Sequence, residues 1–537
     1  MKRMDVGFYL AGEWVKSGVL RPSGDPFRDD KPIKLVHLAQ PQHVAEAYRR
    51  AEAAAAAWRD IACEERANFL EGAFDLVYEQ RYEIAKLISR EQGKTLTEAL
   101  TLEVIPSLDM LRFYASKAPL FLSPDKVSFH QPFFHTKESR VVFAPLGVVA
   151  VLTSSYAPWV APFMATVLAL ITGNAVLLKP SVKTALCGLK VAEIFHELRL
   201  PPGLLSVLTG GDQTGALVAG QPVQAITLVG ARETCERVAR DSSCTFKKLI
   251  IECGGKNPFI VLEDANLDVA ATAALWGAFS NNGQSHGATD RLLLQESIAG
   301  EFKEILLERF RNLKLGDPLD PDTDLGPMID TERHEFLERL ISDAVSAGAR
   351  ILARKEIPEG LGKNFFAPVI LENVDNTMHL SREPYYGPIL TIQTFRNDAE
   401  LLELANDTIY GLSASLWSSD VERLGELLGR MQFGNIWVND VMFPYEAPQA
   451  PWGGTKESGH GQLHSPYGLL EYVYLKHVGF DSAQHPSKDY YFPYNRDLRG
   501  YIEKIAESLK ITNPFTRFLN KLWFWDLSRM RQIRDDQ

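Results

Sequence analysis

Residues 146–253 alternate between short apolar runs and helical segments, and this alternation restricts the possible folds more than any other feature of the chain. Five apolar runs have the character of buried strands: 146–153, 175–179, 204–208, 225–229 and 248–253. The segments between them have helical spacing, notably at 159–171, 186–198 and 233–240. Strands that alternate with single helices form a parallel sheet through right-handed crossovers. The sequence therefore predicts an α/β fold that binds ligands, dinucleotides among them, at the carboxyl ends of its strands.

The flanking segments differ from this pattern. Residues 1–122 are mostly helical, with helical spacing at 42–58 and 64–89 and a short strand and turn at 8–14. Two β-prone runs within 127–144, joined by a polar loop, favour a hairpin arm. A second α/β unit is expected over 254–470. The C-terminal part has an aromatic turn at 490–494, an amphipathic segment at 498–509 and an apolar, aromatic segment at 515–531.

Charge and cysteine content exclude several classes of protein. The net charge is −11 and there is no basic block, which argues against nucleic-acid binding. The five cysteines are widely spaced without a CxxC pair, so we expect neither a disulfide framework nor a metal site, and a reducing, cytoplasmic environment. The N-terminus has no apolar signal segment, and the most apolar stretch, 159–178, is interrupted by proline and glycine.

Two polar stretches between apolar runs indicate a site. Residues 281–291, with the sequence NNGQSHGATDR, lie between the apolar runs 274–276 and 292–294. Upstream, a predicted buried strand ends at Glu252 and is followed by Gly254 and Gly255. A carboxylate at the end of a strand caps a helix or acts as a general base, and the glycines behind Glu252 favour the second role.

These stretches resemble the two active-site signatures of the aldehyde dehydrogenase superfamily. The resemblance extends over roughly residues 8–480 and includes the motifs 178–181 (LKPS), 386–388 (YGP), 406–412 (NDTIYGL) and 452–459 (WGGTKESG). It implies an α/β fold in which 1–122 and 145–253 form a Rossmann-like NAD(P)-binding domain and 254–470 a catalytic domain. It also implies a small β oligomerisation arm at 123–144 and 471–480, followed by an extension at 481–537, and hence a homodimer or homotetramer.

The chemistry that this resemblance implies needs a cysteine thiolate to attack an aldehyde, an oxyanion site, NAD or NADP as hydride acceptor, and a glutamate to activate water. Glu252 matches the glutamate. His286 stands at the nucleophile position and Tyr156 at that of the oxyanion asparagine. An imidazole serves as base or hydrogen-bond donor but forms no thioester. Cys253 is a weak substitute nucleophile, because the two-residue strand period turns it away from Glu252.

The cofactor residues follow from the same resemblance. Lys179 matches a lysine that contacts the adenosine ribose. Ser181 and Lys183 flank Val182 and would tolerate a 2′-phosphate, which favours NADP weakly. Pro384 replaces the glutamate that normally holds the nicotinamide-side ribose, and Glu383 is one residue out of register. The remaining candidates are Gly211, Gly215, Gly230, Ala231 and Tyr386.

Three functional hypotheses remain at this point. The chain is an NAD(P)-dependent enzyme that oxidises an aldehyde to a carboxylic acid, a pseudoenzyme that keeps the fold for binding or assembly, or a nucleophile-replaced form of an active enzyme. The segment 515–531 has three interpretations of its own: a helix docked on the protein's surface, a gate of the substrate tunnel, or a contact with a membrane surface.

Overall fold

The computed structural model describes residues 5–28, 32–129, 137–442, 447–482, 491–492 and 494–510. The chain divides into two compact units. The first comprises residues 1–121 and 145–474, and the second 122–144 and 475–537.

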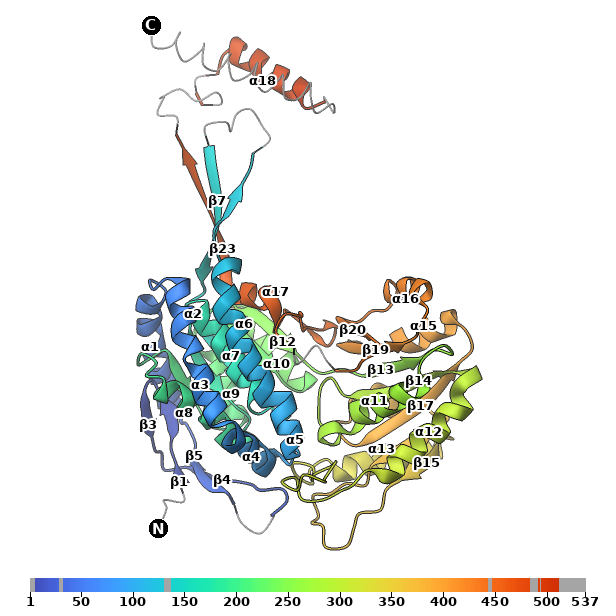
Figure 1. Ribbon diagram of the computed structural model, residues 1–537. Coiled ribbons are helices and arrows are strands. Elements are labelled where there is room, and N and C mark those ends of the chain that lie inside the picture. Colours follow the sequence, from blue (N-terminus) through green and yellow to red (C-terminus); the bar gives the residue numbers. More distant parts are fainter. Residues whose placement is uncertain are drawn as a thin grey trace. The chain divides into compact units, whose positions relative to one another are not determined.

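The first unit contains an eight-stranded sheet in the order β22-β12-β11-β8-β9-β10-β2-β3. Figure 1 labels β3 and β12 of this sheet and several of the helices that cover it. Five neighbouring strands are parallel, as predicted: β8 (Val148–Leu152), β9 (Ala175–Lys179), β10 (Leu205–Val207), β11 (Ala225–Val229) and β12 (Lys248–Glu252). Antiparallel strands cover both edges: β2 (Phe8–Leu10) with β3 (Glu13–Val15), and β22 (Gly459–His460). The strand ends that precede α7, α9 and α10 therefore meet along one edge of the sheet.

Helices connect these strands and cover the sheet. The crossover helices are α7 (Val160–Ile171), α8 (Ala185–Glu197), α9 (Asp212–Gly220) and α10 (Arg232–Ser242), and α1 (Pro41–Trp58) packs against β8 and β9. The region 64–89, which has helical spacing throughout, is divided among α2 (Cys63–Glu71), α3 (Ala73–Glu79) and α4 (Arg81–Gln92), with breaks at Gly72 and Gln80. It continues through α5 (Leu96–Ala99), the π-helical turn η1 (Leu100–Val104) and α6 (Ile105–Phe121). A small sheet, β1 (Asp5–Val6), β5 (Lys34–His37) and β4 (Leu20–Ser23), lies near the N-terminus.

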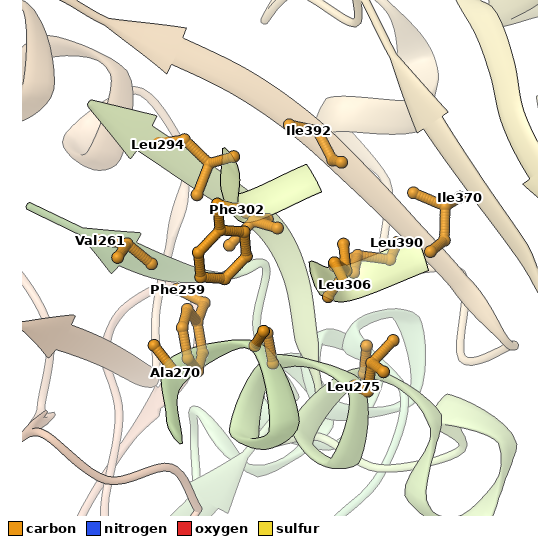
Figure 2. Packing of buried hydrophobic residues seen from close by; sticks show 14 of the residues in the cluster. Phe259, Val261, Ala270, Leu275, Leu294, Phe302, Leu306, Ile370, Leu390 and Ile392 are labelled. Atoms are coloured by element: carbon orange, nitrogen blue, oxygen red, sulfur yellow. The ribbon is translucent and has the colours of Figure 1, made fainter. Parts of the chain in front are cut away.

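A second sheet, of seven strands, follows residue 253 in the order β15-β16-β17-β14-β13-β19-β20. Its strands are β13 (Asn257–Val261), β14 (Thr289–Gln295), β15 (Arg350–Arg354), β16 (Val369–Glu372), β17 (Ile389–Phe395), β19 (Ser413–Trp417) and β20 (Asn435–Val438). Its helices are α11 (Leu267–Phe279), α12 (Ala299–Asn312), α13 (His334–Ser346), α14 (His379–Arg382), α15 (Asp398–Asn406) and α16 (Val421–Leu428). Figure 2 shows Phe259, Leu294 and Ile392 of the strands packed against Leu275 and Phe302 of α11 and α12. The short ladder of β18 (Tyr410–Gly411) with β21 (Thr455–Lys456), then α17 (Ser465–Glu471), complete this part.

The second unit contains the predicted hairpin. Strands β6 (Asp125–Val127) and β7 (Lys137–Pro145) pair antiparallel, and β23 (Val473–Asp481) joins β7 on its other side. The helix α18 (Arg496–Ser508) corresponds to the amphipathic segment predicted at 498–509. The segment 515–531, with its three interpretations, lies outside the described residues. Among the described residues, no helix combines the length and the apolar character that a membrane span requires.

Candidate active site

The site lies where strand ends and loops of the two sheets of the first unit meet. Glu252 is the last residue of β12, His286 lies in the turn before β14, and Tyr156 lies in the loop after β8. Gly254 lets these groups approach one another, because its φ is +86° and an added Cβ would overlap the Tyr386 hydroxyl and lie 3.3 Å from His286 Cδ2. A glycine is therefore required behind the carboxylate.

Glu252 is buried and accepts hydrogen bonds from three side chains. His286 Nδ1 lies 2.7 Å from Oε1, the Tyr156 hydroxyl donates to Oε1 at 2.7 Å, and Trp452 Nε1 donates to Oε2. Burial by itself raises the pKa of Glu252, but the hydrogen bonds from His286, Tyr156 and Trp452 outweigh burial and lower it. The carboxylate is therefore ionised, and both of its oxygens are occupied by protein donors.

The turn that presents His286 is held by buried amides. Asn281 has a positive φ of 52°, its backbone N–H donates to Glu98 Oε1 at 2.7 Å, and its side-chain oxygen accepts from Gln92 at 2.6 Å. Asn257 Nδ2 donates to the His286 carbonyl at 2.8 Å. These bonds fix the backbone on both sides of the imidazole.

The loop that presents Tyr156 is held by a buried ion pair. Lys94 Nζ lies 2.6 Å from Glu103 and donates to the Tyr156 carbonyl at 3.1 Å. The other oxygen of Glu103 accepts the Trp159 and Val160 amides at 2.8 and 3.1 Å, at the start of α7. The pair thus ties the loop after β8 to the helical region 81–104.

One cavity, of about 570 Å³, joins this cluster to the predicted cofactor residues. Its walls include the predicted positions Tyr156, Lys179, Ser181, Gly215, Gly230, Ala231, His286 and Tyr386. Gly211 and Glu383 are not among the described lining residues, and their role in cofactor binding stays a prediction. The hydroxyls of Thr153 and Ser154 belong to residues that line the cavity and have no hydrogen-bond partner in the described part of the chain.

Comparison with known families matches residues 14–478 to the aldehyde dehydrogenase family. Aminoaldehyde dehydrogenase 2, peroxisomal, of Pisum sativum is 37% identical over 428 residues, which cover 78% of this chain and 84% of the relative. The chain belongs to the aldehyde dehydrogenase family. Betaine aldehyde dehydrogenase of Bacillus subtilis is 32% identical over 488 residues, which cover 88% of this chain and 97% of the relative.

Solved structures of aldehyde dehydrogenases show the same fold. Betaine aldehyde dehydrogenase of Staphylococcus aureus in complex with NAD+ aligns with a TM-score of 0.86 at 29% identity, over 92% of this chain and 98% of that chain. An NADP-dependent enzyme of E. coli aligns with a TM-score of 0.85 at 30% identity, over 89% and 98% of the two chains. The predicted family and fold are therefore confirmed.

In this aldehyde dehydrogenase, the assignment of His286 to the nucleophile position stays a prediction, and the cavity, as far as its lining residues are described, offers no thiol in its place. No cysteine is among the described residues that line the cavity, and Cys253, although buried next to Glu252, is not one of them. The family motif 452–459 contains Trp452, whose contact with Glu252 sequence reasoning missed. A buried indole N–H usually has a hydrogen-bond acceptor. The tryptophan in this family motif was therefore the sequence feature that could have pointed to a buried acceptor nearby.

Near the predicted ribose site of this aldehyde dehydrogenase, Lys183 is engaged by two carboxylates. Its Nζ lies 2.6 Å from both Asp330 Oδ2 and Glu332 Oε2. Val182 and Ser181 line the cavity beside it. The charge of Lys183, which favoured NADP in the sequence, is therefore balanced by protein groups.

Proposed function

We propose that this aldehyde dehydrogenase binds NAD or NADP and oxidises an aldehyde to the corresponding carboxylic acid. The observation that carries the proposal is that one and the same cavity has Lys179 and Ser181 as well as Tyr156 and His286 in its walls. A nucleotide and a reacting aldehyde in this one cavity would lie next to each other. Its volume of about 570 Å³ is in the range of cofactor sites.

The residues present fit a dinucleotide. The Lys179 ammonium faces the cavity and has no hydrogen-bond partner among the described residues; burial lowers the pKa of Lys179 to about 8, against the charge of Asp212. Helix α10 starts after Ala231, which lines the cavity, and a helix N-terminus supplies amides to a phosphate. Lys179 and Ser181 would hold the adenosine ribose, and Gly230 and Ala231 the pyrophosphate. When bound, the oxidised nicotinamide accepts a hydride from the substrate carbon.

The family's thioester route is not open to this chain, because His286 replaces the thiol and Glu252 is occupied by three donors. Oxidation therefore needs a route without a covalent thioester. Acid–base catalysis by an imidazole is the chemistry that the cluster retains.

Calorimetric titration with NAD+ and with NADP+ tests cofactor binding, and a panel of aldehydes tests turnover through the formation of reduced cofactor. Amino and betaine aldehydes come first in the panel, because relatives are named for them. We expect binding of at least one cofactor, weakened in Lys179→Met, and turnover of at least one aldehyde. Failure of both cofactors to bind would contradict the proposal, and a chain that binds but never turns over would support a pseudoenzyme.

We also propose a homodimer or homotetramer that assembles through the β6–β7 arm and acts in the cytoplasm. All five cysteines are free, which supports a reducing compartment, although relatives are named as peroxisomal or chloroplastic. Light scattering on the full chain and on a chain without residues 123–144 tests the assembly. An unchanged mass after this deletion would contradict it.

A further inference from the structure

The His286 imidazole has one ring nitrogen engaged by the protein. Nδ1 lies 2.7 Å from Glu252 Oε1, and this is the one hydrogen bond of the ring among the described residues. The ring contacts those of Tyr156 and Tyr386, at centroid distances of 4.4 and 5.5 Å, and it lines the cavity. Nε2 is therefore the nitrogen that remains for a ligand.

The partner of Nδ1 decides which tautomer the ring adopts. An ionised carboxylate only accepts hydrogen bonds, so Nδ1 carries the hydrogen that Glu252 receives. In the neutral ring, Nε2 then has a lone pair and no hydrogen. This is the arrangement that an imidazole needs to act as a general base.

Glu252 itself is shielded from water, because it is buried and is not among the described residues that line the cavity. Oε1 accepts from Tyr156 and His286, Oε2 accepts from Trp452, and the residue is only 1% exposed. Its effect on a ligand must therefore pass through His286. Glu252 is a positioning residue here, and His286 is the group that meets the substrate.

We propose that His286 Nε2 is the catalytic base and that it acts on the hydrated aldehyde, a geminal diol, without a covalent enzyme intermediate. The inference rests on the proposed function. The O–H bond of one diol hydroxyl breaks and its proton passes to Nε2, while the C–H bond breaks and its electron pair leaves as hydride to oxidised NAD or NADP. The electron pair of the broken O–H bond forms a second bond between the carbon and that same oxygen, which gives the carboxylic acid, and the proton passes from Nε2 to solvent.

The diol substrate explains why the cluster needs neither a thiol nor a water-activating glutamate. In the thioester route, water enters after hydride transfer. In a hydrate, the second oxygen is already attached to the carbon before oxidation. The reaction then needs a base for one proton only, that of a diol hydroxyl, and a single positioned imidazole can accept it.

The first experiment compares the full chain with His286→Gln, His286→Cys and the matched control His196→Gln, whose imidazole is not among the described residues that line the cavity. We expect kcat to fall at least about 100-fold in His286→Gln, with cofactor affinity within about threefold, and no loss in His196→Gln. Thermal unfolding of each variant confirms that it is folded. Wild-type turnover in folded His286→Gln would overturn the inference, and so would turnover in His286→Cys alone. No turnover in any of the chains would overturn the proposed function itself.

The second experiment follows His286 without turnover. Diethyl pyrocarbonate acylates an unprotonated imidazole nitrogen, and peptide mass mapping reports modification at His286. We expect modification in the free chain, protection by NAD+ or NADP+, and slower modification in Glu252→Gln, where the amide can donate to Nδ1 and place the hydrogen on Nε2. Equal rates in wild type and Glu252→Gln would overturn the role of Glu252 in positioning the base.

Mass spectrometry of the intact protein, quenched during turnover, separates the two routes directly. We expect no acyl adduct on the wild-type chain, and an adduct together with inactivation by iodoacetamide in any His286→Cys chain that turns over. An acyl adduct on the wild-type chain would overturn the inference.

Discussion

His286 Nδ1 lies 2.7 Å from Glu252 Oε1. The residue predicted at the family's nucleophile position and the residue predicted at its general-base position therefore form one hydrogen-bonded pair. Tyr156, predicted at the oxyanion position, donates to the same oxygen. The departures at 156 and 286, which are separate changes in the sequence, thus belong to one cluster around Glu252, and Trp452 completes it.

The buried Lys94–Glu103 pair should dominate the stability of the Tyr156 loop. Glu103→Gln leaves the Lys94 ammonium, which is 4% exposed, without its counter-charge. We expect the free energy of unfolding to fall by about 3–5 kcal/mol, because breaking a buried pair leaves an uncompensated charge. Thermal unfolding measures the change. Glu79→Gln, an exposed match in α3, should stay within about 0.5 kcal/mol, and equal stability of the two variants would contradict the prediction.

Cofactor affinity should fall as the pH rises through about 8, where burial places the pKa of Lys179. Below that pH the ammonium is charged, so it donates strongly to the ribose hydroxyls and attracts the negative charge of the cofactor; above it the amine is neutral. The decrease should be larger for NADP, whose 2′-phosphate adds charge. Titration calorimetry on both sides of pH 8 measures it. Lys179→Met should lose this step, and a variant that retains it would show that another group titrates.

Removing one carboxylate beside Lys183 should favour NADP. In Glu332→Gln, the Lys183 ammonium keeps Asp330 at 2.6 Å but loses Glu332, so its charge is only partly balanced. We expect the ratio of NADP to NAD affinity to rise by up to about fivefold, since exposed charge pairs contribute about 1 kcal/mol or less. Binding of both cofactors is measured in parallel, with Glu335→Gln as control on the neighbouring helix α13. An unchanged ratio would place the 2′-position away from Lys183.

Gly254→Ala should disrupt the site. The φ of +86° strains any L side chain, and the added methyl group would overlap the Tyr386 hydroxyl. We expect a lower melting temperature and loss of protection of His286 by cofactor. Gly425→Ala, in the interior of α16 with nothing within 4 Å of an added Cβ, should leave the melting temperature unchanged or raise it. Similar behaviour of the two variants would contradict the role of Gly254.

Local sequence predicts the secondary structure of the first unit well. The five parallel strands from β8 to β12, and the helices between them, follow from apolar runs that alternate with helical spacing, because a strand buried on both faces needs apolar residues throughout. The motifs around Glu252 and His286 also indicate the family from local sequence alone. They encode short turns, and the geometry of a short turn depends on neighbouring residues. The division of 64–89 at Gly72 and Gln80 could not be read from periodicity alone.

The site itself depends on contacts between segments far apart in the chain. Trp452 reaches Glu252 across 200 residues, and Lys94 reaches the Tyr156 carbonyl across 62. The sequence by itself determined the fold, the glycine that admits the cluster and the absence of a thiol at position 286. Only the tertiary structure decided that both carboxylate oxygens of Glu252 accept hydrogen bonds from protein donors and that the charge of Lys183 is balanced by two carboxylates. It also decided that Nδ1 of His286 is bonded to the protein, which leaves Nε2 for a ligand. Hydrogen bonding and burial depend on which groups lie close together in space, and local sequence does not show which distant residues come into contact.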